Sequence, residues 1–296
     1  MKILITGSNG LLGQKLVTLL TAEGVEVVAT ARGENRLPAS AAYTYQRLDI
    51  TNRQEVLQVI ETYQPDVVIH TAAMTNVDQC EQEPAACHDL NVNAVKYLIE
   101  ACRNCHLIHL STDFIFDGSH GPLTEEDEPN PISIYGESKL EAENLLKASD
   151  IKWSIARTVL VYGIAHDMSR SNIVLWVKNS LESGKHIQVV NDQWRTPTLA
   201  EDLAMGCYLI ARHGATGIFN ISGDELMTPY DMAMATVEHF NLDGSLITET
   251  DRSKFTQPAK RPPKTGFIVD KAKNELGYQP HSFKEGLVVL EQQMKG

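Results

Sequence analysis

A tyrosine and a lysine four residues apart are the side chains whose types and spacing best suit chemistry in this sequence. They stand in Tyr135-Gly136-Glu137-Ser138-Lys139, and a four-residue interval puts both on one face of a helix. A phenol alone is a weak acid and base at neutral pH, because its ordinary pKa is about 10. A nearby ammonium favours the phenolate, so we expect Lys139 to lower the pKa of Tyr135. The pair could then exchange a proton with a carbonyl or a hydroxyl; the alternative is a helix start with a solvated lysine.

A glycine-rich turn near the start of the chain predicts a phosphate-binding corner. The β-branched run Lys2–Thr6 predicts a strand, and Gly7, Gly10 and Gly13 follow it before an amphipathic run to Ala22. Strand, glycine turn and helix in this order bind the pyrophosphate of a dinucleotide at the N–H groups that open the helix. The alternative is a tight strand-to-helix turn that binds no ligand.

The end of the second predicted strand, Val25–Ala29, bears on which dinucleotide is bound. Arg32 stands about twenty residues after Gly13, where a site that prefers NAD(H) has an acidic residue. A guanidinium there suits a 2′-phosphate, so we expect NADP(H) to be preferred and NAD(H) to be possible, and Arg36 could assist. The alternative is a solvated loop arginine.

Later strands end in residues that could also contact the cofactor. Asp49 closes the short run 47–50 and could accept a hydrogen bond from the adenine amino group, or it could cap the helix that begins near Arg53. The run Thr71–Ala73 follows the buried-looking strand 65–70, and its small side chains allow close approach of a ligand. Because the carboxyl ends of parallel strands share one edge of a sheet, we expect these residues to meet there.

Two further polar segments have two interpretations each. Ser111-Thr112-Asp113 follows the strand 107–110, and the Thr112 hydroxyl could bond the oxygen that Tyr135 protonates, or it could only shape a turn. Asn91 and Asn93 lie in what reads as one long helix from Pro84 to Cys105. They are either surface residues or polar anchors of the site, and the sequence does not separate the two.

Composition excludes several classes of function. The 296 residues include 26 basic and 38 acidic side chains, for a net charge of -12, which disfavours a nucleic-acid binder. No apolar run is long enough to span a bilayer, and too few residues precede Ile3 for a secretory signal. Five cysteines, an odd number, indicate free thiols in a reducing cytoplasm. We therefore expect a cytoplasmic protein without nucleic-acid or membrane partners, and the absence of a clustered Cys/His motif predicts no metal.

The order of these motifs resembles the extended short-chain dehydrogenase/reductases and, within them, the dTDP-4-dehydrorhamnose reductase family. The resemblance covers essentially the whole chain. It is carried by Thr6-Gly7-x-x-Gly10-x-x-Gly13, Asp49-Ile50, His70 to Asp78, Ser111 to Gly118, Tyr135-x-x-x-Lys139, Arg157-Thr158, Val161-Tyr162-Gly163, Asn191-Asp192-Gln193, Pro197-Thr198 and Arg261-Pro262-Pro263.

The resemblance implies an α/β fold with a Rossmann-type doubly wound parallel sheet and a smaller, interleaved C-terminal α/β substrate domain. The dinucleotide-binding domain is expected at residues 1–163 with returns near 196–218, and the substrate domain at 164–195 and 219–296. The implied activity is NADPH-dependent reduction of the C4 keto group of a nucleotide-linked 6-deoxysugar, with dTDP-4-dehydro-L-rhamnose to dTDP-L-rhamnose as the expected case. A homodimer is left open.

The resemblance also implies a set of site residues. The catalytic residues are expected to be Thr112, Tyr135 and Lys139. The expected cofactor contacts, besides Tyr135 and Lys139, are Gly7, Asn9, Gly10, Leu11, Leu12, Gly13, Arg32, Asp49, Ile50, Thr71, Ala72 and Ala73. The expected substrate contacts are Thr75, Val77, Asp113, Phe114, Phe116, Trp194 and Arg195.

Two departures from the family pattern concern the substrate. Leu160 stands where the family usually has a Trp, and Arg195 follows Trp194 where a small residue is usual. Arg195 could take a diphosphate, and Trp194 could stack on a sugar or a base. One alternative is an epimerase or dehydratase of the same superfamily, although segment 111–113 supplies only one of the two carboxylates that a dehydratase usually needs. The other is a cofactor-binding regulatory subunit without catalysis, against which the complete catalytic set argues.

Overall fold

Seven strands of the described chain form one parallel sheet. The computed structural model describes residues 1–38, 40–167, 171–255 and 257–295. The strands lie in the order β10 (Gly217–Asn220), β6 (Trp153–Thr158), β5 (His106–Thr112), β4 (Val67–His70), β1 (Lys2–Thr6), β2 (Glu26–Ala31) and β3 (Tyr43–Arg47). The chain runs outward from β1 to β3 and then crosses back to β4, so the strand order reverses between β1 and β4. Ligands of open α/β sheets bind beside such a reversal, at the carboxyl ends of the strands.

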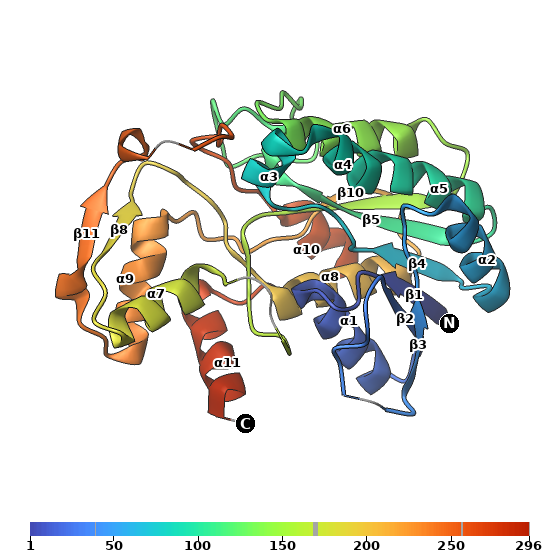
Figure 1. The fold of residues 1–296 in the computed structure, drawn as a ribbon, viewed down its shortest axis with the longest axis horizontal. Helices are drawn as coiled ribbons and strands as arrows, with labels where there is room; N and C mark the ends of the chain where they lie inside the picture. The colour runs from blue at the N-terminus through green and yellow to red at the C-terminus, as the bar shows by residue number, and fades with distance from the viewer. Residues whose placement is uncertain (39, 168–170, 256, 296) are drawn as a thin grey trace.

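Helices cover both faces of this sheet (Figure 1). Alternate side chains of β1 enter different layers, since Ile3 and Ile5 pack on one side and Leu4 on the other. The layer around Ile3 contains α1 (Leu11–Ala22), α8 (Ala200–His213) and α10 (Asp270–Leu276). The layer around Leu4 contains α2 (Arg53–Tyr63), α5 (Ala94–Ala101) and α6 (Ile134–Lys147). The predicted Rossmann-type doubly wound fold is thereby confirmed.

A smaller lobe stands beside the sheet (Figure 1). It contains α7 (Ile173–Glu182), α9 (Pro229–Phe240), α11 (Phe283–Lys295) and the parallel pair β8 (Ile187–Val190) and β11 (Ile247–Thr250). A second parallel pair, β7 (Val161–Tyr162) and β9 (Thr198–Leu199), lies where the chain leaves and re-enters the sheet layer. The predicted domain division stays a prediction, with one correction. Ala272 and Leu276 of α10 pack in the sheet core, although residues 219–296 were all expected in the substrate domain.

The segment predicted as one helix from Pro84 to Cys105 is divided. It consists of α4 (Pro84–His88), a π-helical turn over Asp89–Asn93, and α5. A short helix, α3 (Val77–Gln82), follows the loop after β4, and Asp49 and Ile50 follow β3 instead of closing a strand. Short 3₁₀ turns cover Asp113–Ile115, Gly244–Leu246 and Arg252–Lys254. Among the described residues, no helix is both long and apolar enough to cross a membrane.

Candidate active site

The glycine turn after β1 fits the pyrophosphate of a dinucleotide. Gly7 has a φ of 77°, and a Cβ added there would lie 2.8 Å from the backbone nitrogen of Ala72, so only glycine lets the turn lie against the end of β4. Gly10 is the N-cap of α1 and has no side chain to bond the first N–H groups of the helix. These N–H groups, with the positive end of the helix dipole, suit a phosphate.

The adjoining loop is held across this turn by Asn9. The Asn9 amide donates to the Glu34 carbonyl (2.6 Å) and accepts from the Arg36 N–H (3.0 Å). Arg32 is exposed at the end of β2, and its carbonyl accepts from Arg47 Nε (3.0 Å). Arg32 thus follows the end of β2, the strand next to β1 and its glycine turn, with its side chain exposed, and a contact with a 2′-phosphate stays a prediction.

Asp49 does not cap the helix that follows it, because Asn52 accepts from the first N–H groups of α2. The Asp49 carboxylate accepts instead from the N–H (3.0 Å) and the hydroxyl (2.7 Å) of Thr51. Burial raises the pKa of Asp49, but the Thr51 hydrogen bonds, together with the Arg32 and Arg47 charges, outweigh it and hold the pKa below its ordinary value. The group is therefore an ionised acceptor at neutral pH.

Helix α6 brings Tyr135 and Lys139 to the carboxyl edge of the sheet. Ser133 caps the helix by accepting from the Gly136 N–H (3.2 Å). A Cβ at Gly136 would collide with the carbonyl oxygen of Phe114, so glycine lets the first helical turn pack directly on the turn that follows β5. Both Tyr135 and Lys139 are buried, with 8% and 3% of their surfaces exposed.

The environment of Tyr135 favours the neutral phenol. Burial raises the pKa of Tyr135 above its ordinary value, and a hydrogen bond with Thr112 acts against this without cancelling it. The Phe114 ring packs edge-on against Tyr135 at 5.7 Å between centroids. The expected lowering of this pKa by Lys139 is therefore wrong for this structure. A neutral phenol beside a Thr hydroxyl is arranged to donate a proton to a carbonyl oxygen.

The amine of Lys139 points to a histidine of the sheet. Its Nζ lies 3.0 Å from His109 Nε2, on the neighbouring strand β5. Burial lowers the pKa of Lys139 to about 8, and the nearby Glu143 carboxylate acts in the opposite direction. At neutral pH the group is still mainly an ammonium, in an interior where few charges are found.

Asn91 is a polar anchor of the site, a role that the sequence left open. The π-helical turn directs its amide inward, where it accepts from Met74 N–H (2.8 Å) and donates to the Met74 carbonyl (3.1 Å) and to Ser138 Oγ (3.0 Å). It therefore ties the loop after β4 to α6. Asn93 bonds Asp89 on the helix surface instead. Two residues apart on a helix, the two asparagines face nearly opposite sides, and the structure shows that the Asn91 side faces inward.

Asp113 and Arg195 bind each other. Arg195 Nε lies 3.3 Å from the Asp113 carboxylate, both side chains are almost fully buried, and Thr265 donates to the same carboxylate (2.5 Å). The Arg195 guanidinium also donates to the carbonyls of Trp194 and Pro262, each at 2.7 Å. A diphosphate contact by Arg195 stays a prediction, and its guanidinium is already engaged within the protein.

Replacing Arg195 with Leu should destabilise the protein by about 3 kcal/mol, because it leaves the Asp113 carboxylate buried without its counter-ion. Denaturant unfolding measures this loss. Arg53→Leu is the matched control, since Arg53 pairs with Glu100 on the surface and its loss should leave stability close to wild type. Equal unfolding midpoints for the two variants would contradict a structural role for the buried pair.

The remaining predicted substrate contacts are dispersed. Thr75 is exposed after β4, and Val77 opens α3. Phe116 is buried in a core cluster with Phe267 and Val159, so the structure does not bring it to a ligand-accessible surface. Trp194 is 38% exposed and could meet a ligand.

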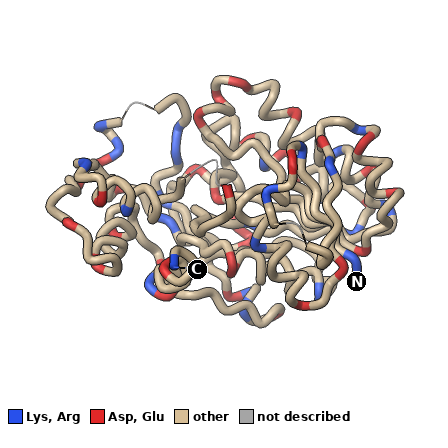
Figure 2. Tube along the Cα trace, turned by 60° about the horizontal axis from the view of Figure 1, so that its bottom comes forward, with Lys and Arg blue, Asp and Glu red and all other residues tan. Residues whose placement is uncertain are grey.

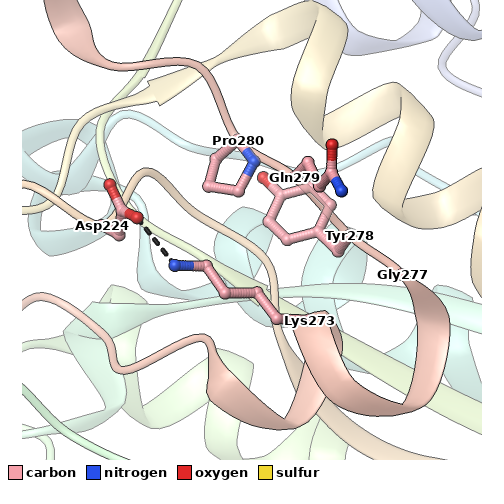
Figure 3. Close-up of a pocket in the computed structure, with 6 residues that line it drawn as sticks. All are labelled: Asp224, Lys273, Gly277, Tyr278, Gln279 and Pro280. Atoms are coloured by element: carbon pink, nitrogen blue, oxygen red, sulfur yellow. Dashed lines mark hydrogen bonds and ion pairs between the residues drawn. The ribbon is translucent and has the colours of Figure 1, made fainter.

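Two cavities lined by described residues bear on where a ligand could bind. One of about 240 Å³ lies in the smaller lobe, and its lining includes Trp176, Gln188, Phe255, Arg252 and Arg261. The other, of about 330 Å³, is lined by Asp224, Lys273, Gly277, Tyr278, Gln279 and Pro280 (Figure 3). In the second cavity Lys273 is paired with Asp224 at 2.8 Å, and in the first Arg261 and Arg252 are paired with Asp78 and Asp192 at 2.7 and 3.5 Å. No residue of the predicted site lines either cavity. The first cavity combines two arginines with two aromatic rings, and this lining makes it the better candidate for a substrate.

The fold and the site together define a class of protein. The protein is an extended short-chain dehydrogenase/reductase. Its parallel sheet, with a second lobe beside it, carries a glycine turn after β1, a hydroxyl at the end of β5, and Tyr135 with Lys139 on α6. The model of the RmlD substrate binding domain family matches residues 1–295, and the chain belongs to that family. The prediction of an NAD(P)-dependent oxidoreductase of this type is confirmed.

Relatives and solved structures agree with this membership. The chain is 32% identical to a dTDP-4-dehydrorhamnose reductase of Aggregatibacter actinomycetemcomitans, over 97% of each chain. It is 31% identical to methionine adenosyltransferase 2 subunit beta of Rattus norvegicus, over 82% of this chain and 73% of that one. A dTDP-4-dehydrorhamnose reductase structure from Clostridium acetobutylicum matches with a TM-score of 0.89, 32% identity and full coverage of both chains. One from Bacillus anthracis in complex with NADP matches with a TM-score of 0.87 and 27% identity, over 99% of each chain.

Proposed function

We propose that the protein reduces the C4 ketone of a nucleotide-linked 6-deoxysugar with NADPH, and that dTDP-4-dehydro-L-rhamnose is converted to dTDP-L-rhamnose. The observation that carries the proposal is the buried Tyr135 hydroxyl, hydrogen-bonded with Thr112 at the carboxyl end of β5. The names of the reductase relatives support the substrate, and the neighbour crystallised with NADP supports the cofactor.

NADPH, when bound, supplies the hydride that adds to C4. Tyr135 gives its phenolic proton to the O4 oxygen, so the ketone becomes a secondary alcohol and the tyrosine becomes a phenolate. Thr112 donates to the same oxygen and fixes its position. The Lys139 ammonium stabilises the phenolate and holds the hydroxyls of the nicotinamide ribose. The glycine turn 7–13 takes the pyrophosphate, Arg32 takes the 2′-phosphate and Asp49 takes the adenine amino group.

The nucleotide half of the substrate is best accommodated in the smaller lobe. Residues 252–264 carry five basic side chains in an otherwise acidic protein, and Figure 2 shows the Lys and Arg positions along the trace. Arg252 and Arg261 from this segment line the 240 Å³ cavity, with the Trp176 and Phe255 rings also in its wall. Arginines suit a diphosphate and aromatic rings suit a base, which supports a nucleoside diphosphate as the part of the substrate that stays attached to the sugar during reduction.

The test is NADPH oxidation, followed by absorbance, against a panel of nucleotide-linked 4-keto sugars, with product identified by mass spectrometry. Stoichiometric loss of NADPH with a product two mass units heavier is the expected result. A product of unchanged mass without net NADPH loss would indicate an epimerase. No turnover on any sugar, together with binding to a methionine adenosyltransferase catalytic subunit, would favour the regulatory role suggested by the second relative.

The cofactor assignment predicts the effect of Arg32→Asp. Replacing a guanidinium with a carboxylate should repel the 2′-phosphate and accept the 2′-hydroxyl instead, and should lower the ratio of NADPH to NADH efficiency by ~100-fold. The kcat/KM values for the two cofactors measure the ratio. Arg103→Asp makes the same charge change on a loop before β5 and serves as the control. An unchanged ratio in the Arg32 variant would remove Arg32 from the cofactor site.

A further inference from the structure

A row of buried polar side chains crosses three neighbouring strands and ends at Lys139. Thr6, His70 and His109 are partners in register on β1, β4 and β5, so their side chains emerge on the same face of the sheet. Thr6 Oγ1 lies 2.7 Å from His70 Nδ1, and the His70 ring stacks on the His109 ring with centroids 5.3 Å apart. His109 Nε2 then lies 3.0 Å from Lys139 Nζ.

Both histidines are neutral at physiological pH. Burial and, to a smaller extent, the Lys139 ammonium lower the pKa of His70 to about 3, and the same two causes hold the pKa of His109 well below its ordinary value. An ammonium has only donors, so the hydrogen bond assigns His109 Nε2 as an unprotonated acceptor. The ring proton then sits on Nδ1, which has no hydrogen-bond partner among the described residues.

The Glu143 carboxylate, on the same helix as Lys139, is another candidate acceptor for its ammonium, but it binds a different side chain. The Glu143 carboxylate receives two hydrogen bonds from the buried Arg157, at 3.0 and 2.8 Å. A carboxylate bound to Lys139 would also neutralise the positive charge that a phenolate at Tyr135 requires. A neutral imidazole fixes the direction of the ammonium and leaves its charge available.

We propose that His109 is a positioning residue for Lys139, and that the His70–Thr6 contacts fix His109 relative to the glycine turn. Thr6 immediately precedes Gly7, so the row joins the phosphate-binding corner to the catalytic helix through the sheet. The proposal rests on the proposed function for its effect on catalysis. Its geometric part, the hydrogen bond between His109 and Lys139, can be tested without a substrate.

Replacing His109 with a residue that has no acceptor should destabilise the charged form of Lys139. A hydrogen bond to the charged form of a group favours that form, so its loss lowers the pKa of Lys139 below about 8. A bond to a charged group corresponds to a shift of about one pH unit or more. The titratable groups packed around Lys139 are His109 of β5, His70 of β4, Cys87 of α4, and Tyr135 and Glu143 of α6.

The first experiment is a titration of Lys139 by NMR in protein labelled with ¹³C at lysine Cε, with Lys139→Arg used to assign the signal. His109→Leu should move the titration midpoint down by about one pH unit. His109→Gln, which keeps an acceptor oxygen, should restore part of the shift. His106→Leu is the matched control, because His106 is a buried histidine of the same strand that bonds Ser154 (2.7 Å), and it should leave the Lys139 midpoint unchanged.

A midpoint in His109→Leu equal to that of wild type would overturn the proposal, and so would an equal shift in His106→Leu. If His109→Leu does not fold, the wild-type protein still tests the proposal through the tautomer of His109. In ¹⁵N-histidine spectra at pH 7, His109 should carry its proton on Nδ1, and a proton on Nε2 would contradict the assignment.

A separate measurement of activity tests the effect of His109 on catalysis. The kcat of His109→Leu should fall ~10-fold or more at pH 8, and its alkaline loss should begin about one pH unit lower than in wild type. A merely structural role would lower the amount of folded protein without moving the pH profile. If wild type reduces no 4-keto sugar, the proposed function fails, while the NMR titration still decides whether His109 holds Lys139.

Discussion

Tyr135→Phe should lower turnover by about 10²–10⁴-fold, the usual contribution of a positioned general acid. Phenylalanine fills the same space and keeps the edge-on packing with Phe114, so the change removes the proton donor with little loss of structure. NADPH should still bind with an affinity within a few-fold of wild type, because the glycine turn and Arg32 are untouched. Stopped-flow NADPH oxidation measures the first quantity and calorimetric titration with NADPH the second.

The matched control for this prediction is Tyr208→Phe. Tyr208 lies on α8 in the other helical layer, and its hydroxyl makes a long hydrogen bond of 3.4 Å to the Glu23 carboxylate. This variant should keep wild-type turnover. Full activity in Tyr135→Phe would place the proton donor elsewhere, and lost NADPH binding would show that the substitution disturbed the cofactor site instead of the chemistry.

Lys139→Met should lower turnover by about 10²–10³-fold and should also weaken NADPH binding, because one amine serves both the phenolate and the nicotinamide ribose. Methionine retains the length and the apolar stem of the lysine but has no charge. Lys147→Met on the same helix is the control, since Lys147 is half-exposed and contacts the outer side of Glu143. Kinetics of Lys139→Met that match those of Lys147→Met would contradict the assigned role.

The ionisation of Lys139 predicts that the rate of reduction depends on pH. The pKa of Lys139 is lowered to about 8, so the ammonium is present below that pH and is lost as the pH rises through it. Reduction should therefore decline above about pH 8, well before Tyr135 ionises, because burial raises the pKa of the phenol. In Lys139→Arg the charge persists at all accessible pH values, and the decline should disappear even though turnover is lower. A decline that persists in this variant would assign the titration to another group.

Local patterns predicted much of the fold. The strand-glycine-helix order at residues 2–22 and the four-residue spacing of Tyr135 and Lys139 are properties of short segments, and the structure has a strand, a turn and helices at those positions. The division of the segment 84–105 was missed, because no glycine and no proline after Pro84 marks the π-helical turn in the sequence.

The sequence by itself determined the class of fold and the candidate catalytic residues, because periodicity, glycine positions and short spacings are set by covalent neighbours. Only the tertiary structure decided what surrounds those residues. Burial raises the pKa of Tyr135 against expectation, Arg195 is bound to Asp113, and His109 faces Lys139 from a different strand. These effects depend on desolvation and on partners 30 or more residues away in the chain. A local sequence pattern predicts neither the desolvation nor the distant partner.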